Sequence, residues 1–444
     1  MSLLEKLKQF TLSPYYIGLA GLICFTCWFF DALIVGIAIL AALFSICLIA
    51  FKDTSSALPP LILCTFAISR QLFVTDYMPI ILGVAPVVLL SIALHFVLHR
   101  PKLKGGKFIL GLLLASAAMI MGGIGFDWRA ENILVVAGFC LLIVFVYVFF
   151  YSTAGEKLKE VALNSFVASV MVLLLQITAY YFRQEDVVQA VVNKSLNVGW
   201  GISNNIAFVL SMLLPVLFYK AITSRLPFFY LALACLDYFG IIFTMSRGNI
   251  IFGGLFMLFG MVFSFIKSRQ KGKYLIALAV SLAIIAALAI AFKDVLVAVY
   301  EWLLEIKLDA RGRVDLIKEG FEAFKSRPVF GIGFFHMHAE IPHWFHNSLV
   351  QILTSTGIVG SLLFIPFFYQ RYMVVARNFN LCSFMMACSI LLSGLYALME
   401  CNFFFVYNLA FIMVEYIIIE RERDTVDLLQ EIKERLFKRK ASAR

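Results

Sequence analysis

The stretch from Tyr15 to Phe51 reads YYIGLAGLICFTCWFFDALIVGIAILAALFSICLIAF, and Asp31 is its only charged residue. A helix needs about 20 apolar residues to cross the hydrocarbon core of a bilayer, so this stretch is too long for a single span. We therefore predict two membrane helices, near residues 15–30 and 32–51, joined by a tight hairpin at Asp31. Irregular backbone is excluded from lipid, so the pattern predicts a bundle of transmembrane helices.

The composition of the whole chain agrees with this prediction. The sequence is 62% hydrophobic and 14% charged, and its mean hydropathy is +0.94. Soluble domains carry about 25% charged residues, so a soluble globule is excluded. We expect an all-α polytopic bundle of about twelve to fourteen spans, forming a single integral membrane domain over residues 1–444. The further helices are predicted near 57–74, 78–98, 107–126, 133–151, 161–182, 205–220, 226–245, 249–266, 274–292, 347–369, 381–398 and 402–420.

Short basic segments set the predicted orientation. With fourteen spans they all fall on one side, which the positive-inside rule identifies as the cytoplasm. Both termini and the charged tail 421–444 are then cytoplasmic, and the long loop 293–346 faces outward. The net charge of +10 indicates attraction to anionic membrane lipid and gives no evidence for nucleic acid. The segments are 100–107, 157–159, 220–225, 267–273, 371–377 and 421–444.

The long loop between the spans ending near 292 and starting near 347 predicts a small helical cap. Val295–Leu308 and Arg313–Ser326 each have apolar residues at helical spacing on one face. Neither segment is long or apolar enough to span, so we expect both to lie at the membrane surface. Pro328 ends the second helix, and the pair Gly331-x-Gly333 is expected to turn the chain.

Four arginines are candidate anion ligands on the outer side. Arg247 lies in a tight turn between two apolar runs, where a charge is costly unless it has a partner. Guanidinium offers a rigid fork of donors for phosphate oxygens, although an arginine marking the membrane edge would have the same position. Arg311 and Arg313 precede a helix start and join Arg247 in a predicted basic cluster for a pyrophosphate. Arg70 supports the same argument more weakly.

The loop also contains four histidines, and two interpretations of them stay open. His336, His338, His343 and His346, with Glu340, suggest a metal site, but their spacing matches no established metal motif. The other interpretation makes one histidine a general base for a hydroxyl nucleophile. His346 is the best placed for that role, because it lies at the membrane boundary beside Asn347.

Several motifs occur in a fixed order between residues 204 and 360. They are Asn204-Asn205-Ile206-Ala207, Ser246-Arg247-Gly248, Ala310-Arg311-Gly312-Arg313-Val314-Asp315-Leu316, Arg327-Pro328-Val329-Phe330-Gly331-Ile332-Gly333, His346-Asn347-Ser348-Leu349-Val350-Gln351 and Thr356-Gly357-Ile358-Val359-Gly360. This set of motifs resembles the O-antigen ligase and O-antigen polymerase family. The resemblance extends from about Asn204 to Gly360. The first 200 residues contribute only their hydropathy.

The resemblance implies a GT-C-like membrane glycosyltransferase of the bacterial cytoplasmic (inner) membrane, with its active site on the outer face. Such enzymes move a glycan from a polyprenyl-pyrophosphate carrier to a glycan or lipid-linked acceptor, without a cofactor or a required metal. Arg247 and Arg313 match the family's functional arginines and His346 its functional histidine. Arg311, Arg70, Asn205 and Asn347 are expected to bind substrate. A transporter or flippase for an anionic or lipid-linked substrate is the alternative, as is a scaffold for envelope-polymer export.

Overall fold

The computed structural model describes residues 2–70, 74–124, 130–268, 270–304, 311–333, 345–377, 379–401 and 406–422. In this part of the chain the regular structure is helical, and β pairing is limited to an isolated bridge between Asn197 and Ile202. The prediction of an all-α polytopic helix bundle is confirmed.

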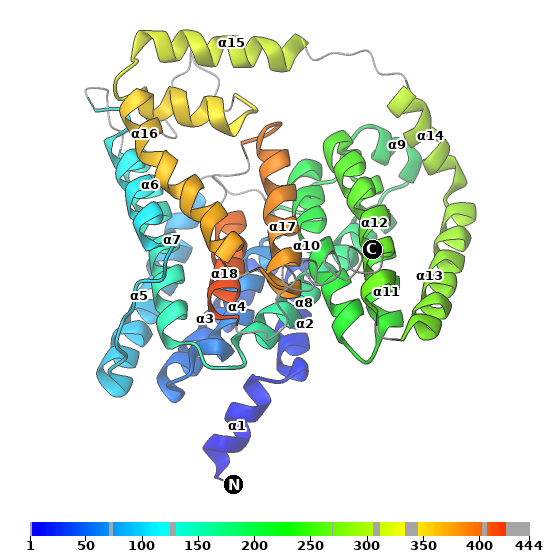
Figure 1. Cartoon of the computed structure of the whole chain (residues 1–444), viewed down its shortest axis with the longest axis horizontal. Coiled ribbons are helices and arrows are strands. Elements are labelled where there is room, and N and C mark those ends of the chain that lie inside the picture. Colours follow the sequence, from blue (N-terminus) through cyan, green and yellow to red (C-terminus); the bar gives the residue numbers. More distant parts are fainter. Residues whose placement is uncertain are drawn as a thin grey trace, which may run out of the picture. The chain divides into compact units, whose positions relative to one another are not determined.

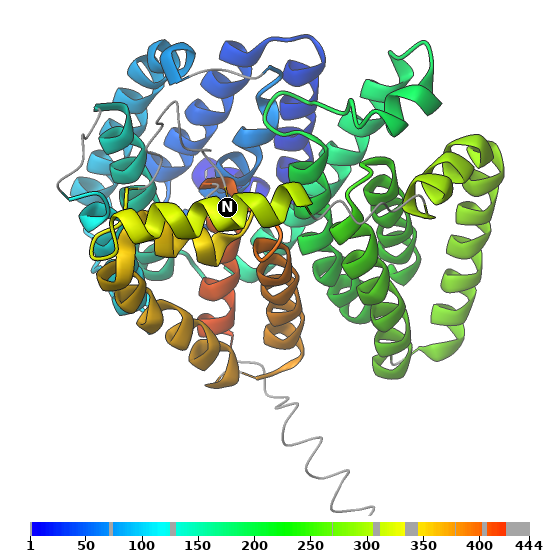
Figure 2. The same cartoon turned by 90° about the horizontal axis from the view of Figure 1, so that it is seen from above.

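The chain divides into two compact units (Figures 1 and 2), so the prediction of one membrane domain stays a prediction. Unit 1 comprises residues 1–103 and 152–312, and unit 2 comprises residues 104–151 and 313–444. The helices of unit 1 are α1 (Leu3–Thr11), α2 (Pro14–Phe29), α3 (Leu33–Ala50), η1 (Thr54–Ala57), α4 (Leu58–Leu63), η2 (Cys64–Ala67), α5 (Val74–His99), α8 (Leu158–Phe182), α9 (Val187–Val192), α10 (Ser203–Thr223), α11 (Pro227–Phe243), α12 (Arg247–Lys267), α13 (Lys271–Ala291) and α14 (Lys293–Leu304). The helices of unit 2 are α6 (Ile109–Met121), α7 (Ala130–Thr153), α15 (Arg311–Ser326), α16 (Ser348–Arg377), α17 (Leu381–Ala397) and α18 (Val406–Arg421).

The predicted hairpin at Asp31 is present. Helix α2 ends at Phe29 and α3 begins at Leu33, and Asp31 between them has a φ of 53°. Aspartate tolerates this left-handed conformation better than most residues, which suits it to a tight turn. The Asp31 carboxylate also accepts a hydrogen bond from the Ser69 hydroxyl, so the turn is tied to a later segment of unit 1.

The predicted span 57–74 is wrong as a single helix. Residues 54–67 form three short helices in succession, η1, α4 and η2, and Phe66 and Ala67 near their end are fully buried. Broken backbone is tolerated at membrane depth only where protein surrounds it and supplies hydrogen bonds. Here Gln176 of α8 donates its side-chain amide to the Phe66 carbonyl at 2.6 Å, and Trp200 donates its backbone N–H to the Ile68 carbonyl at 3.1 Å.

Seven helices in the described residues are long and apolar enough to cross a membrane, or eight if the bent pair α1 and α2 counts as one span. Five further apolar segments contain 10 to 17 residues each. Four of them coincide with predicted spans, and the fifth is the broken segment 54–67. The count of twelve to fourteen membrane crossings stays a prediction.

Both helices predicted in the long loop are present, as α14 and α15. In unit 2, α15 lies across the first part of α16 (Figures 1 and 2). Thr354 of α16 donates its hydroxyl to the Gly320 carbonyl of α15 at 2.9 Å. A Cβ at Gly320 would meet the Val350 side chain at 2.6 Å, so glycine permits the close approach of these two helices.

Helix α16 breaks at Gly357, and the segment after Pro328 fills the break. Gly357 has φ 63° and ψ −165°, which interrupts the helical hydrogen-bond ladder. The carbonyls of Thr354 and Ser355 accept from the N–H groups of Ile332 and Gly333, each at 2.9 Å. In return, the N–H groups of Ile358 and Val359 donate to the carbonyls of residues 328 and 329, at 2.9 and 3.2 Å. The glycine-rich motifs thus hold the bend in α16, and Gly331-x-Gly333 turns the chain as predicted.

Candidate functional site

His346 lies immediately before the capped start of α16. The side-chain oxygen of Asn347 accepts from the backbone N–H groups of Leu349 and Val350, both at 3.0 Å, and its amide group donates to the Leu398 carbonyl at 2.9 Å. His346 itself has a φ of 47°, a conformation that is uncommon outside glycine. The cap therefore fixes the backbone from which the imidazole projects.

A buried aromatic anchor fixes the other side of His346. Phe345 is 1% exposed and packs in an apolar cluster with Ala323, Ile332 and Val350. Its backbone N–H donates to the Gln351 side chain at 3.2 Å. Residues on both sides of His346 are thus held, and the imidazole has few ways to move.

Glu400, just after α17, connects His346 to Arg313. One carboxylate oxygen lies 2.6 Å from His346 Nδ1, and the other lies 2.9 Å from Arg313 Nη2. Glu400 is 7% exposed, and its carbonyl accepts from the Ser348 hydroxyl at 2.9 Å. We call Arg313, His346 and Glu400 the carboxylate-linked triad. The structure brings together two predicted catalytic residues through a third that was not predicted.

The carboxylate-linked triad has the geometry of a general base with an orienting acid. A carboxylate at Nδ1 selects the tautomer that carries its proton on Nδ1, which leaves the Nε2 lone pair to accept a proton. The imidazole is 38% exposed and the Arg313 side chain 49%, so a substrate can reach both. Glu400 also stabilises the imidazolium that forms when Nε2 is protonated.

Arg247 begins α12 in unit 1 and lies over the ring of Trp302. The distance from its Cζ atom to the ring centroid is 4.2 Å, which is cation–π geometry. The preceding turn is tightly bonded: Met245 has a φ of 53°, and the Asn249 amide donates to the Ser246 hydroxyl at 3.0 Å. The turn therefore presents an exposed guanidinium, which Trp302 contacts through its ring face.

Residues 228–365 match the family model of the O-antigen ligase. The matched segment is about a third of the chain, and it supports the resemblance to the O-antigen ligase and polymerase family. No curated protein matches the chain. The match supports a multi-pass membrane enzyme of O-antigen assembly with a glycosyltransferase-like reaction.

The segment that matches the O-antigen ligase model contains most of the predicted site residues. Glu400, which was not predicted, lies outside that segment. Arg247, Arg311, Arg313 and His346 all lie within it. Arg311 begins α15, and its side chain lies outside the described part of the structure. The predicted cluster that combines Arg247 with Arg313 stays a prediction, because the two arginines belong to separate units.

Two of the predicted substrate-binding residues, Asn205 and Asn347, have structural partners among the described residues. The Asn205 side-chain oxygen accepts from the Ile202 backbone N–H at 3.3 Å and so caps the start of α10. Asn347 instead precedes its helix, and its side-chain oxygen caps the backbone N–H groups in the first turn of α16. Arg70 is exposed in unit 1, where the backbone of Gly199 packs against it. Substrate contacts of all three stay predictions.

The metal hypothesis falls mainly on residues that the structure does not describe. His336, His338, His343 and Glu340 lie outside the described residues. Within the described ranges, no group of three or more His, Cys, Asp or Glu side chains could hold a metal ion. His346 there has a carboxylate partner, which suits the base interpretation.

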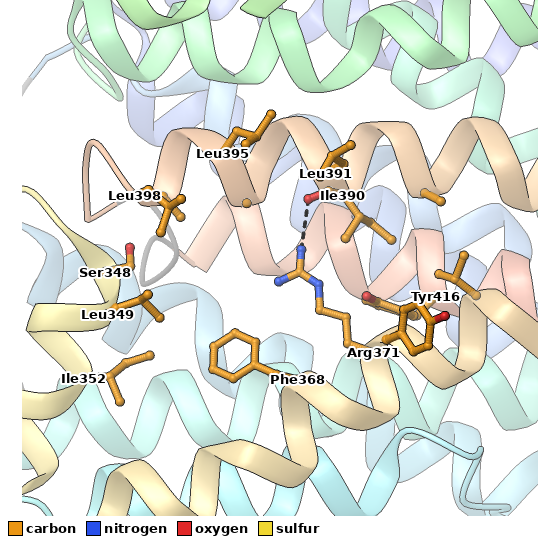
Figure 3. Close-up of a pocket in the computed structure, with 15 residues that line it drawn as sticks. Ser348, Leu349, Ile352, Phe368, Arg371, Ile390, Leu391, Leu395, Leu398 and Tyr416 are labelled. Atoms are coloured by element: carbon orange, nitrogen blue, oxygen red, sulfur yellow. Dashed lines mark hydrogen bonds between the residues drawn. The ribbon is translucent and has the colours of Figure 1, made fainter. Parts of the chain in front are cut away.

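The described residues line apolar cavities in both units, and one cavity in each unit lies near candidate site residues. The cavity in unit 2 has a volume of about 460 Å³ and lies between α16 and α17 (Figure 3). It begins at Ser348 and Leu349, next to the carboxylate-linked triad, and extends to Arg371. The cavity in unit 1 has a volume of about 370 Å³, and its aromatic wall residues are Tyr181, Phe182, Phe239, Phe243 and Phe292.

Proposed function

We propose that this chain is a glycosyltransferase of the bacterial cytoplasmic membrane that moves a glycan from a polyprenyl-pyrophosphate carrier to an acceptor hydroxyl, with its active site on the outer face. The observation that carries the proposal is the contact of Glu400 with both His346 and Arg313. This contact joins a base for the acceptor to a cation for the leaving group. Both groups are needed to transfer a sugar from a pyrophosphate.

His346 acts on the acceptor in the proposed reaction. Its Nε2 atom takes the proton of the acceptor hydroxyl while the hydroxyl oxygen attacks the anomeric carbon. The bond from the anomeric carbon to the pyrophosphate oxygen breaks in the same displacement, which inverts the configuration. The proton stays on His346, and Glu400 balances the resulting positive charge.

The arginines act on the departing polyprenyl pyrophosphate. The leaving oxygen gains negative charge as the glycosidic bond breaks, so a nearby guanidinium stabilises the transition state more than the bound substrate. Arg313, which shares Glu400 with His346, supplies this charge in the proposed reaction, and Arg247 is a further predicted ligand of the diphosphate. Arginine suits this work because its donors form a planar fork that matches phosphate oxygens.

The apolar cavity of unit 1 supports binding of the prenyl chain. Phe243 lines this cavity and ends α11, and Arg247 begins the next helix only four residues later. A carrier whose diphosphate contacts Arg247 can therefore place its first prenyl groups against the aromatic wall. Membrane lipid surrounds the remaining chain.

Transfer from a polyprenyl-pyrophosphate glycan by the purified protein in detergent tests the proposal. We expect His346→Ala, Arg313→Ala and Arg247→Ala each to lower the rate by at least about a hundredfold. His99→Ala and Arg183→Ala are matched controls: His99 is a half-buried histidine at the end of α5, and Arg183 stacks on Phe29, with its Cζ atom 4.4 Å from the ring centroid.

Three outcomes would contradict the proposal in different ways. Wild-type transfer by all three site variants would remove the assigned roles. Translocation of the lipid-linked glycan by the protein in vesicles, with no transfer product, would favour the transporter alternative. Equal losses in the control variants would show that the site substitutions act through protein stability.

A further inference from the structure

The ring of Trp302 is shared by two cations. Arg247 Cζ lies 4.2 Å from the ring centroid, and Lys194 Nζ lies 5.9 Å from the same centroid. The two cations come from separate elements: Arg247 begins α12, and Lys194 follows the end of α9. Helix α9 packs against α14, which carries Trp302, so the contact lies within unit 1.

The position of Lys194 is built by its backbone and by a neighbouring helix. Its φ is 52°, and its N–H donates to the Val191 carbonyl at 2.9 Å, which ends α9 in a tight turn. Its ammonium group donates to the side-chain oxygen of Asn204, in the first turn of α10, at 3.3 Å. Lys194 is half-buried, so its orientation is restricted. Asn204 stands beside Asn205, but its side chain faces Lys194, whereas that of Asn205 caps α10.

Two cations beside one ring form a basic pair that a single anion can contact. A cation on an aromatic face gains about 0.5–2 kcal/mol, so the ring helps to hold both groups in place. An anion that contacts both cations is attracted by each of them. A diphosphate suits the arrangement, because its two phosphate groups can each contact one cation.

We propose that Lys194, held by Asn204, is a second cation for the donor diphosphate and acts with Arg247 around Trp302. This inference rests on the proposed function and adds a binding residue to it. Lys194, just after α9, supplies a compact ammonium charge, and Arg247, at the start of α12, supplies the planar donors of its guanidinium. Because Lys194 contacts the diphosphate before and during transfer, its main contribution is to donor affinity.

The KM for the polyprenyl-pyrophosphate donor measures this contribution. We expect Lys194→Gln to raise that KM about tenfold with a much smaller change in kcat, and Lys194→Arg to restore most of the affinity. Inhibition by inorganic pyrophosphate should weaken in the Gln variant to a similar extent. Asn204→Ala should shift both quantities in the same direction, but less.

Lys220→Gln is the matched control. Lys220 donates to the Asn164 side chain at 2.8 Å and lies 5.5 Å from the Tyr230 ring centroid, so its partners are of the same kinds as those of Lys194. It lies in the last turn of α10, at the opposite end from Asn204. We expect Lys220→Gln to leave the donor KM and the pyrophosphate inhibition unchanged.

The outcomes separate this inference from the proposed function. A wild-type donor KM and wild-type pyrophosphate inhibition in Lys194→Gln, with His346→Ala inactive, would overturn the role of Lys194 alone. Equal shifts in the Lys194 and Lys220 variants would also overturn it, because the effect would then not be local. Wild-type transfer by His346→Ala and Arg313→Ala would instead overturn the proposed function.

Discussion

Replacing Glu400 with glutamine tests the role of the carboxylate-linked triad with little change in shape. The carboxylate accepts from His346 Nδ1 at 2.6 Å and from Arg313 Nη2 at 2.9 Å through its two oxygens. A glutamine side chain has one acceptor oxygen, and its amide group can only donate. Arg313 can only donate, so the remaining oxygen faces Arg313 and the amide group donates to His346 Nδ1. The imidazole then carries its proton on Nε2, which can no longer act as the base.

The expected loss is large for catalysis and small for stability. The corresponding Asp→Asn change in the serine-protease triad costs about 10⁴ in kcat, so a loss of about 10²–10⁴ is expected here, or about 2.7–5.4 kcal/mol. The Arg313 side chain is 49% exposed and that of His346 38%, so water compensates for much of the lost pairing. We expect a stability change of about 1 kcal/mol or less.

Transfer kinetics and thermal unfolding in detergent measure the two effects together. Glu322→Gln is the control, because Glu322 pairs with Lys325 at 2.7 Å on the exposed face of α15. That variant should keep both its kcat and its melting temperature. A Glu400→Gln enzyme with wild-type kcat would refute the reasoning, since His346 would then act without an orienting acid. A loss of activity that merely parallels unfolding would refute it as well.

Three further predictions concern the fold and the metal hypothesis. Gly357→Ala should sharply reduce the yield of folded protein on size-exclusion chromatography, because a Cβ there would meet the Val329 carbonyl oxygen at 2.3 Å. Gly272→Ala is the control, and it should keep the wild-type yield because no atom lies within 4 Å of its added Cβ. Asp237→Leu should raise the free energy of unfolding by about 1–3 kcal/mol, and with it the melting temperature. The reason is that Asp237 is fully buried and neither carboxylate oxygen has a partner among the described residues. A lower melting temperature would contradict this prediction. EDTA should leave the transfer rate unchanged, and loss of activity restored by zinc would instead support histidine ligands.

Helix positions could be predicted wherever the length of an apolar run decides the structure. The stretch around Asp31 is too long for one span and has a single polar residue at which to turn, so the hairpin follows from length alone. Residues 54–67 are also apolar, but they are buried in protein instead of facing lipid. Their break depends on a hydrogen bond from Gln176, which is 110 residues away from Phe66. No local pattern contains that information.

The candidate site was predictable in its motif residues but not in the residue that joins them. His346 and Arg313 stand in recognisable motifs, whereas Glu400 follows His346 by 54 residues and lies beyond the matched family segment. One signal was present: Glu400 is an acid at the end of an apolar run, and such a group needs a partner. The sequence also could not separate capping from binding for Asn205 and Asn347, because asparagine before or within a first helical turn suits both roles.

A single carboxylate shared by the base and an arginine couples the two halves of the proposed reaction. Before transfer, Glu400 divides its negative charge between the guanidinium of Arg313 and the imidazole N–H of His346. As His346 takes the acceptor proton, it becomes a cation and attracts more of that charge. The field of Arg313 is then less cancelled by Glu400 at the moment when charge develops on the pyrophosphate. Proton transfer on the acceptor side therefore strengthens the stabilisation of the leaving group, which a separate base and arginine would not achieve.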